Sequence, residues 1–335
     1  MPYVITCWNG YNSMNASLKN VFVNPELAYL RSGWRIGIFL VIMTACSFLI
    51  TAPGIYLLKI FPMLNSSGTQ LFFVYAGVTA ATWITLRFVD KRPFISIGLT
   101  FRAPAAKELS IGLLFGAGMM SLIFAIEFVS GMVHIEFRSL TVQQQLGIFF
   151  NSAFLYIVVG YGEELLFRGY ILQVLAEGTT RLISALFFGV LFAFAHAKNP
   201  NASLFGLINV GLAGIWLAAA YYKTNALWLP IGMHISWNFF QGFVFGFPVS
   251  GTTSETEQIS KAVQTGAEWI TGGTFGPEGG ALATAMLVIS TAVIYFSPWV
   301  TSSASAWQYS TWRVTRKNEI AERTMNRTEL NPGTP

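Results

Sequence analysis

Two carboxylates and a guanidinium stand in the segment GEELLFRGY, residues 162–170, with apolar runs on both sides. Ionisable side chains inside such a segment are costly to bury and mark functional candidates. Glu164 and Arg168 are four residues apart, so in a helix they face the same way with the acid first, the favourable order for an ion pair. Glu163 lies about 100° around the helix from Glu164. The spacing therefore predicts a neutralised Glu164–Arg168 pair beside a Glu163 carboxylate that is free to face a cavity.

Two later apolar segments add imidazole and amide groups. His196 ends the run FAFAH and follows Phe192 by four residues, and His234 precedes Asn238 by four residues in HISWN. Residues four apart share one face of a helix, so His234 and Asn238 can point into the same space. We interpret Phe192 as a packing residue rather than a chemical one.

Together these side chains support hydrolysis. A carboxylate beside an imidazole can hold a water molecule and take its proton, and imidazole N–H and amide NH₂ groups can stabilise a tetrahedral oxyanion. Alternatively, Glu163, His196 and His234 supply three nitrogen and oxygen ligands, which would leave a catalytic zinc ion its open fourth position. The zincin motif HExxH does not occur in the sequence. Nucleophilic serine catalysis is the weaker interpretation, because GxSxG does not occur either.

Each of these residues also has a purely structural interpretation. A pair such as Glu164–Arg168 can simply lock two helices together, and a histidine in a span can serve as an interhelical hydrogen-bonding group. Glu127 stands in another apolar segment without a second ionisable group beside it, so its role stays open. The combination of a carboxylate, two histidines and an amide in three separate segments, with almost nothing else charged, favours chemistry.

The composition indicates that a membrane protein positions these residues. The 335-residue chain is 53% hydrophobic and only 10% charged, too little charge to cover a soluble surface. Eight apolar segments are candidates to cross a bilayer core of about 30 Å. We place them at 36–58, 70–89, 109–132, 147–172, 182–197, 202–222, 225–246 and 281–300, the fifth being short. Because the apolar runs are continuous, the expected fold is all-α: a polytopic integral membrane helical bundle of about eight transmembrane helices.

The basic residues orient this bundle. Of the 20 Lys and Arg residues, fifteen lie in segments that are inside when the N-terminus is cytoplasmic, four lie outside, and Arg168 lies in a span. The positive-inside rule then predicts both termini in the cytoplasm, with the chain in a plasma (inner) membrane. No basic run is interleaved with aromatic residues, so nucleic acid is not an expected partner. Cys7 and Cys46 indicate neither a disulfide framework nor a thiolate metal site.

The polar stretches divide the chain into five parts. They are a cytoplasmic N-terminal arm (1–34), the transmembrane bundle (35–246), a polar, glycine-rich outer loop (247–280), the last transmembrane helix (281–300) and a cytoplasmic tail (301–335). Within the outer loop, the stretch SETEQISKAVQTGAEW, residues 254–269, is expected to form a short amphipathic helix over the membrane surface.

Three motifs in this order resemble a known family. EELLFRG at 163–169 fits E-E-x-x-x-R, FAFAH at 192–196 fits F-x-x-x-H, and HISWN at 234–238 fits H-x-x-x-N. As an ordered set, each in its own span, they resemble the CAAX protease and bacteriocin-processing (CPBP or Abi) family of intramembrane proteases, which includes the type II CAAX prenyl endopeptidases. The resemblance covers about residues 87–246. It implies an eight-helix bundle whose cavity opens to the cytoplasm or laterally to lipid.

The resemblance also implies an activity and its site. The activity is that of an endopeptidase whose partners are membrane lipid and a membrane-associated or lipidated protein or peptide. The implied roles are a water-activating base at Glu163, a supporting ion pair of Arg168 with Glu164, a group beside the water at His196, and oxyanion contacts at His234 and Asn238. Members of the family are expected to work either with zinc or another divalent metal, held here by Glu163, His196 and His234, or by a metal-free glutamate mechanism. The sequence leaves both open.

Two other functions also stay open. The same fold serves as a non-catalytic membrane scaffold or a bacteriocin self-immunity protein, although the full motif set argues against a degenerate scaffold. A proton-coupled transporter with Glu127 or Glu163 as a relay is less favoured, because the sequence shows no internal repeat of the kind that transporters often carry.

Overall fold

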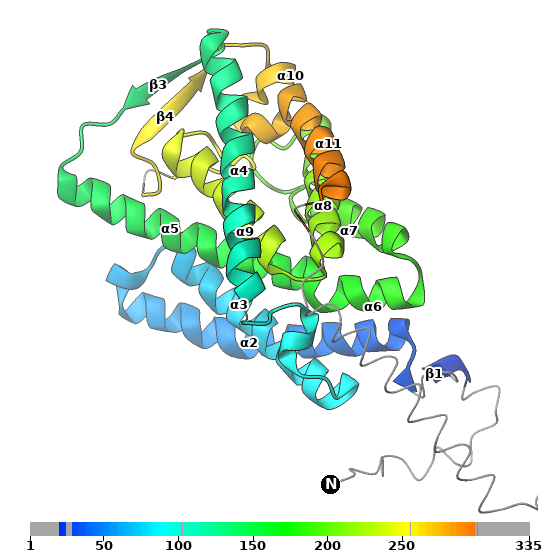
Figure 1. Ribbon diagram of the computed structural model, residues 1–335. Coiled ribbons are helices and arrows are strands. Elements are labelled where there is room, and N and C mark those ends of the chain that lie inside the picture. Colours follow the sequence, from blue (N-terminus) through cyan, green and yellow to red (C-terminus); the bar gives the residue numbers. More distant parts are fainter. Residues whose placement is uncertain (1–19, 25–28, 102, 255, 299, 301–335) are drawn as a thin grey trace, which may run out of the picture.

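The computed structural model describes residues 20–24, 29–101, 103–254, 256–298 and 300. Most of this part of the chain is helical (Figure 1). Cys7, most of the predicted N-terminal arm and the predicted tail from residue 301 lie outside the described residues.

Five helical segments in the described part of the chain are long and apolar enough to cross a membrane. They are α2 (Ser32–Ile60), α3 (Ser67–Ile84) with its π-helical extension η3 (Thr85–Asp90), α4 (Ala103–Val129), α8 (Leu204–Thr224), and the continuous run of α5 (Val142–Glu164), the π-helix η5 (Leu165–Gly169) and α6 (Tyr170–Gly178). Several long apolar helices confirm the expectation of an integral membrane helical bundle in its general form.

The other three predicted spans are helices too, but they are shorter. They are α7 (Arg181–Ala195), α9 (Trp228–Phe239), which continues as the π-helix η6 (Phe240–Val244), and α11 (Ala281–Phe296). At 15, 12 and 16 residues they fall below the roughly 20 residues that a perpendicular span needs. All eight apolar segments are thus helical, while only five reach spanning length, so the expected count of eight transmembrane helices is not established.

Polar caps begin several of these helices. Ser66 and Thr69 form a reciprocal capping box at the start of α3, and Thr141 and Gln144 form another at the start of α5. Ser203 accepts a hydrogen bond from the backbone N–H of Gly206 at the start of α8. These side chains satisfy backbone donors that the first turn of a helix leaves unpaired, and they thereby favour the start of each helix at these positions.

Helices α4 and α9 pack with their backbones in near contact. A Cβ atom added at Gly116 would lie 2.3 Å from the carbonyl oxygen of Met233, and one at Gly232 would lie 2.4 Å from that of Leu109. Small residues permit such close approach of helices in membranes, where van der Waals packing drives association. The glycines therefore hold α9, which carries two of the predicted site residues, firmly against α4.

Two small two-stranded sheets accompany the helices among the described residues. Strand β1 (Val23–Asn24) pairs with β2 (Tyr29–Leu30), and β3 (Val133–Phe137) pairs with β4 (Ser260–Gln264), both antiparallel. Figure 1 shows β3 and β4 at the end of the bundle where α4 finishes, which we call the loop end.

Strand β4 also corrects the amphipathic helix expected over 254–269. In β4, Ser260 and Ala262 are buried while Lys261 is exposed, the two-residue alternation of a strand. The segment pairs with β3 because the connection between α4 and α5 supplies an antiparallel partner more than 120 residues earlier in the chain.

The rest of loop 247–280 returns to the bundle. It contains α10 (Glu268–Thr271) and two short 3₁₀ turns, η7 (Gly273–Phe275) and η8 (Pro277–Gly279). Ser152 of α5 donates a hydrogen bond to the carbonyl oxygen of Glu257 at 2.8 Å, and Asn151 donates to that of Thr256 at 3.0 Å. These bonds hold the loop against α5, the helix that also carries Glu163.

A buried ion cluster holds together the end of the bundle opposite the loop end. Arg35 of α2 contacts Asp90 of η3 and Glu177 of α6, each at 2.5 Å, and Arg92 lies 3.8 Å from Asp90 and 3.7 Å from Glu177. Their side chains are at most 7% exposed. Buried charges need partners of opposite sign, so these four residues fix three helices relative to one another.

Candidate active site

The predicted ion pair lies at the junction of α5 and η5. Arg168 Nη1 is 2.8 Å from Glu164 Oε1, and both side chains are fully buried. Arg168 also donates from Nη2 to the carbonyl oxygen of Gly214 on α8 at 2.9 Å, and its guanidinium lies 4.7 Å from the centre of the Phe192 ring. The change from α-helix to π-helix directly after Glu164 is a feature often found at functional sites. The pair thus joins three helices as well as neutralising itself.

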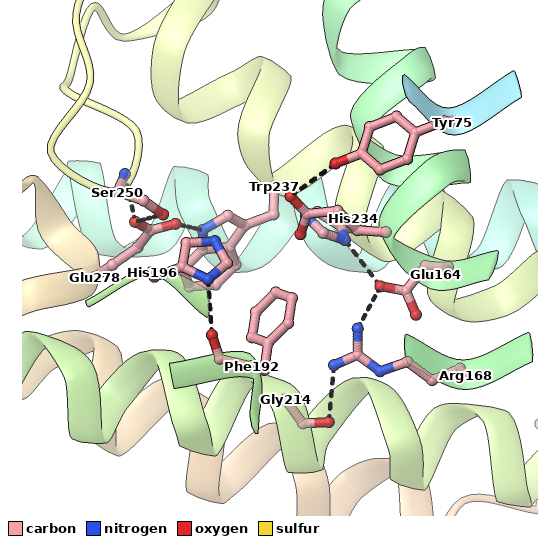
Figure 2. A network of polar contacts seen from close by, with 11 residues as sticks. Tyr75, Glu164, Arg168, Phe192, His196, Gly214, His234, Trp237, Ser250 and Glu278 are labelled. Atoms are coloured by element: carbon pink, nitrogen blue, oxygen red, sulfur yellow. Dashed lines mark hydrogen bonds and ion pairs between the residues drawn. The ribbon is translucent and has the colours of Figure 1, made fainter. Parts of the chain in front are cut away.

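Glu164 has a second partner that the sequence did not reveal. His234 Nδ1 lies 2.8 Å from the same Oε1 atom of Glu164 (Figure 2). A carboxylate paired with arginine only accepts hydrogen bonds, so Nδ1 carries a proton and donates it. The other ring nitrogen, Nε2, lies 3.8 Å from Glu163 Oε2. Glu164 therefore sets both the tautomer and the orientation of an imidazole that faces Glu163.

Glu163 is turned away from the ion pair, as the helical spacing predicts. Tyr75 of α3 donates a hydrogen bond to Glu163 Oε1 at 3.4 Å. Glu163 Oε2 has no hydrogen-bond partner within the described part of the chain. One oxygen is therefore held by Tyr75, while the other is buried beside Nε2 of His234 without a hydrogen bond to a described residue.

His196 follows the last residue of α7 and is held by that helix. Its Nδ1 lies 2.8 Å from the carbonyl oxygen of Phe192, and the two rings are in contact with centroids 4.6 Å apart. A carbonyl oxygen can only accept, so Nδ1 carries the proton and Nε2 is left as an acceptor in the neutral ring. Phe192 thus packs against His196 and Arg168, as its interpretation as a packing residue requires.

One cavity brings four of the six predicted catalytic residues together. It has a volume of about 590 Å³ and is lined by Glu163, His196, His234 and Asn238. Glu164 and Arg168 are absent from its lining and lie behind Glu163 and His234. The predicted set thus divides into four residues that can meet a substrate and a buried pair that supports them.

Loop 247–280 supplies another part of the cavity wall. Ser250, Glu257 and Glu278 line the same space, and Glu278 lies on the opposite side of His196 from the ion pair (Figure 2). Burial raises the pKa of the Glu257 carboxyl above its ordinary value, an effect that a hydrogen bond from Ser67 opposes. The loop predicted on the outer side of the membrane therefore lines the candidate site.

The cavity wall includes residues that the sequence motifs did not identify. Four of them with polar groups are Tyr75, Trp237, Glu257 and Glu278. Trp237 lies between the motif residues His234 and Asn238, so its position in the sequence placed it near the site. Tyr75 lies in an apolar segment with no polar pattern, so nothing in the sequence distinguished it. Glu278 carried a weak signal, because it is an acidic residue within the glycine-rich run GGTFGPEGG, residues 272–280.

The predicted metal ligands do not form a recognisable metal site. Among the described residues, no group of three or more His, Cys, Asp and Glu side chains is arranged so that it could hold a metal ion. His234 Nε2 and Glu163 Oε2 face each other at 3.8 Å, while His196 is oriented by a separate contact with Phe192. Since these donors are not gathered as a ligand set, we derive no step through a metal ion.

Glu127 lies apart from the cavity. It is fully buried at the loop end of α4, and Gln264 of β4 donates a hydrogen bond to its Oε2 at 3.4 Å. Gln264 also donates to the carbonyl oxygen of Thr271 at 2.6 Å. These contacts give Glu127 a place in the packing of β4 against α4, with no link to the catalytic candidates in the cavity lining.

Comparison with known proteins places the cavity in a family context. Residues 144–240 match the family model described as type II CAAX prenyl endopeptidase Rce1-like. The chain is 25% identical over 174 residues to the uncharacterized protein YyaK of Bacillus subtilis (strain 168), an alignment that covers 50% of this chain and 57% of that protein. No solved structure matches the chain. Residues 144–240, which contain all six predicted site residues, are therefore similar to the type II CAAX prenyl endopeptidase Rce1-like family.

Proposed function

We propose that this protein is an intramembrane endopeptidase in which Glu163 activates a water molecule for attack on a peptide bond. The observation that carries the proposal is the lining of one cavity by Glu163, His196, His234 and Asn238. The similarity of residues 144–240 to the Rce1-like family supports CAAX-type intramembrane proteolysis at the level of the family.

In the proposed first step, a water molecule in the cavity hydrogen-bonds to the Glu163 carboxylate and to Nε2 of His196. Glu163 takes a proton from the water, whose oxygen then attacks the carbonyl carbon of the peptide bond. His196 Nε2 is an acceptor in the neutral ring, because Nδ1 donates to Phe192. His196 therefore orients the water by accepting one of its hydrogen bonds. The proton that is removed from the water goes to Glu163.

In the second step, the tetrahedral oxyanion is stabilised by the Asn238 amide and by His234. Because Nδ1 of His234 donates to Glu164, Nε2 can donate to an oxyanion only when the ring is an imidazolium. When the intermediate collapses, the C–N bond breaks and Glu163 returns its proton to the leaving amine. The mechanism thus requires Glu163 ionised and His234 protonated, and we expect a bell-shaped dependence of kcat/KM on pH.

We propose a membrane-associated or lipidated protein or peptide as the substrate. A second, apolar cavity of about 700 Å³ lies between α3 and α5 and shares Tyr75 with the first. Its lining includes Phe72, Trp83, Phe154 and Ile157. An apolar chain held there would stand next to Glu163, because Tyr75 contacts that carboxylate. We further propose a plasma (inner) membrane location with both termini in the cytoplasm, on the basis of the distribution of Lys and Arg along the sequence.

The test is Glu163→Gln in the purified full-length protein, assayed with a library of membrane-anchored peptides. We expect a loss of about 10²–10⁴-fold in kcat, the usual contribution of a general base. Glu136→Gln is the matched control, since the Glu136 side chain is 61% exposed on β3. Cleavage by Glu163→Gln at the wild-type rate would overturn the mechanism. A wild-type protein that cleaves nothing, yet retains a bound partner equally in the Glu163→Gln form, would favour the scaffold or immunity function.

The metal question needs a separate measurement. We propose the metal-free form of the mechanism, because the described residues do not gather three ligands in one place. Elemental analysis of the purified protein, together with activity before and after treatment with a chelator, tests this choice. One equivalent of a divalent metal whose removal abolishes cleavage would overturn the metal-free form, and loss of that metal in Glu163→Gln would identify Glu163 as a ligand.

A further inference from the structure

We infer that Glu278 is a positioning residue of the active site, an inference that rests on the proposed function. Its carboxylate accepts three hydrogen bonds at the cavity wall (Figure 2). Trp237 Nε1 donates to Oε1 at 3.2 Å, while the backbone N–H and the hydroxyl of Ser250 donate to Oε2 at 2.7 and 2.8 Å. One side chain thereby joins α9 to the segment that follows η6.

The Ser250 side of this contact leads to His196. Asn199 donates from its side-chain amide to the carbonyl oxygen of Ser250 at 2.9 Å. The backbone N–H of Asn199 in turn donates to the carbonyl oxygen of His196 at 3.0 Å. The turn that carries His196 is therefore connected to Glu278 through two residues, both of which line the cavity.

The Trp237 side leads to Asn238. The two residues are neighbours on α9 and both line the cavity. The indole of Trp237 also packs against Trp216 of α8, with ring centroids 5.7 Å apart. Fixing the indole at both its N–H and its ring limits rotation of α9 at Asn238. Glu278 thus joins the elements that carry one water-binding candidate and one oxyanion candidate.

The backbone of Glu278 is itself anchored within the bundle. The side-chain amide of Asn209, a residue of α8 that is 1% exposed, donates to the carbonyl oxygens of Glu278 and Gly280 at 2.8 and 2.9 Å. Gly276 has a φ of 98°, and a Cβ atom there would lie 2.2 Å from the carbonyl oxygen of Pro248. Only glycine permits this turn without strain. The glycine-rich run and a buried amide therefore direct Glu278 to the cavity wall.

The contact requires a carboxylate. An ionised carboxylate only accepts hydrogen bonds, and its two oxygens here receive three donors. Glutamine would place an NH₂ group against either the indole N–H of Trp237 or the N–H and hydroxyl of Ser250. Glu278→Gln therefore removes one side of the connection while it preserves the size of the side chain.

Kinetics of the full-length protein test this inference, with a membrane-anchored peptide that the wild type cleaves. We expect Glu278→Gln and Trp237→Phe each to lower kcat about tenfold with KM within about twofold of wild type. The double variant should be as active as the less active single variant, since each change breaks the one connection that passes through Glu278. Glu268→Gln, an exposed acid of the same loop, is the control and should behave as wild type. Additive losses, or a wild-type kcat in Glu278→Gln, would overturn the inference.

A spectroscopic measurement keeps the inference testable without a substrate. In protein labelled with ¹⁵N-tryptophan, one of the ten indole N–H signals disappears in Trp237→Phe and is thereby assigned. We expect that signal to shift in Glu278→Ala, which removes the acceptor of the indole N–H, and to stay in place in Glu268→Gln. An unchanged signal in Glu278→Ala would show that the contact does not exist. If Glu163→Gln is inactive while Glu278→Gln cleaves at the wild-type rate, only this inference is refuted. If the wild-type protein cleaves no peptide, the proposed function is refuted.

Discussion

His234 and Arg168 meet at a single oxygen atom of Glu164. Oε1 of that carboxylate lies 2.8 Å from His234 Nδ1 and 2.8 Å from Arg168 Nη1. The carboxylate has two duties: it neutralises a fully buried guanidinium and it orients an imidazole at the edge of the cavity. Substitutions in this group of three will therefore not be additive, and stability can be separated from activity.

Removing the Glu164 charge should destabilise the protein and abolish cleavage. Glu164→Gln leaves the Arg168 guanidinium buried without its counter-charge, which we expect to lower the free energy of unfolding by about 3–5 kcal/mol. Glu164→Leu combined with Arg168→Met removes both charges and should recover most of that stability. The double variant should still lack activity, because His234 has lost the acceptor for Nδ1. Denaturant or thermal unfolding in detergent measures the first effect, and peptide cleavage the second. Cleavage by the double variant at the wild-type rate would contradict the role given to Glu164.

Loss of the Asn238 amide should affect turnover rather than binding. We expect Asn238→Ala to lower kcat by about 10²–10³-fold, the usual effect of removing one oxyanion donor, with KM nearly unchanged. Asn238→Asp should be at least as severe, since its carboxylate would repel the oxyanion. Steady-state kinetics with one membrane-anchored peptide separates the two parameters. A change confined to KM would show that Asn238 binds the substrate instead.

The ion cluster at the opposite end of the bundle should matter for stability alone. Arg35→Met removes the cation that contacts both Asp90 and Glu177. Breaking a buried pair from one side costs about 3–5 kcal/mol, so we expect a clear fall in the unfolding midpoint. Activity per folded molecule should stay at the wild-type level, because these residues do not line the cavity. Arg31→Met, at an exposed arginine just before α2, is the control.

Glu257 should make stability depend on pH. Burial raises the pKa of this carboxyl in the folded protein above its ordinary value. Between the ordinary and the raised pKa the folded state holds a proton that the unfolded state has released, so stability falls as pH rises through that window and then levels off. Glu257→Gln removes the titrating group and should flatten the curve. Unfolding midpoints of the two proteins, measured from about pH 4 to pH 8, test this. Parallel curves would contradict it.

The sequence could predict contacts that lie within one helix. The Glu164–Arg168 pair and the divergence of Glu163 follow from helical spacing, and all eight apolar segments are helices. Helical spacing allowed four motif residues to share one space, and the cavity itself was implied by the family resemblance.

Contacts between distant segments could not be predicted in this way. His234 is 70 residues from Glu164, Tyr75 is 88 residues from Glu163, and Glu278 is 41 residues from Trp237. No single-sequence pattern encodes these pairings, which depend on how helices pack. The prediction of a helix over 254–269 was wrong for the same reason. Residues 260–264 form a strand because they pair with β3, which is distant in the sequence.

The glycine contact between α4 and α9 leaves no room for α9, which carries His234 and Asn238, to move toward α4. A single methyl group added at Gly116 would lie 2.3 Å from the backbone of Met233, the residue before His234. Changes of substrate preference by engineering should therefore avoid α9 and its support. The more variable wall is the loop segment of Thr252, Thr253 and Ser254, whose side chains line the cavity and belong to no helix. A library of variants built there would reshape what the cavity admits and leave the alignment of His234 and Asn238 intact.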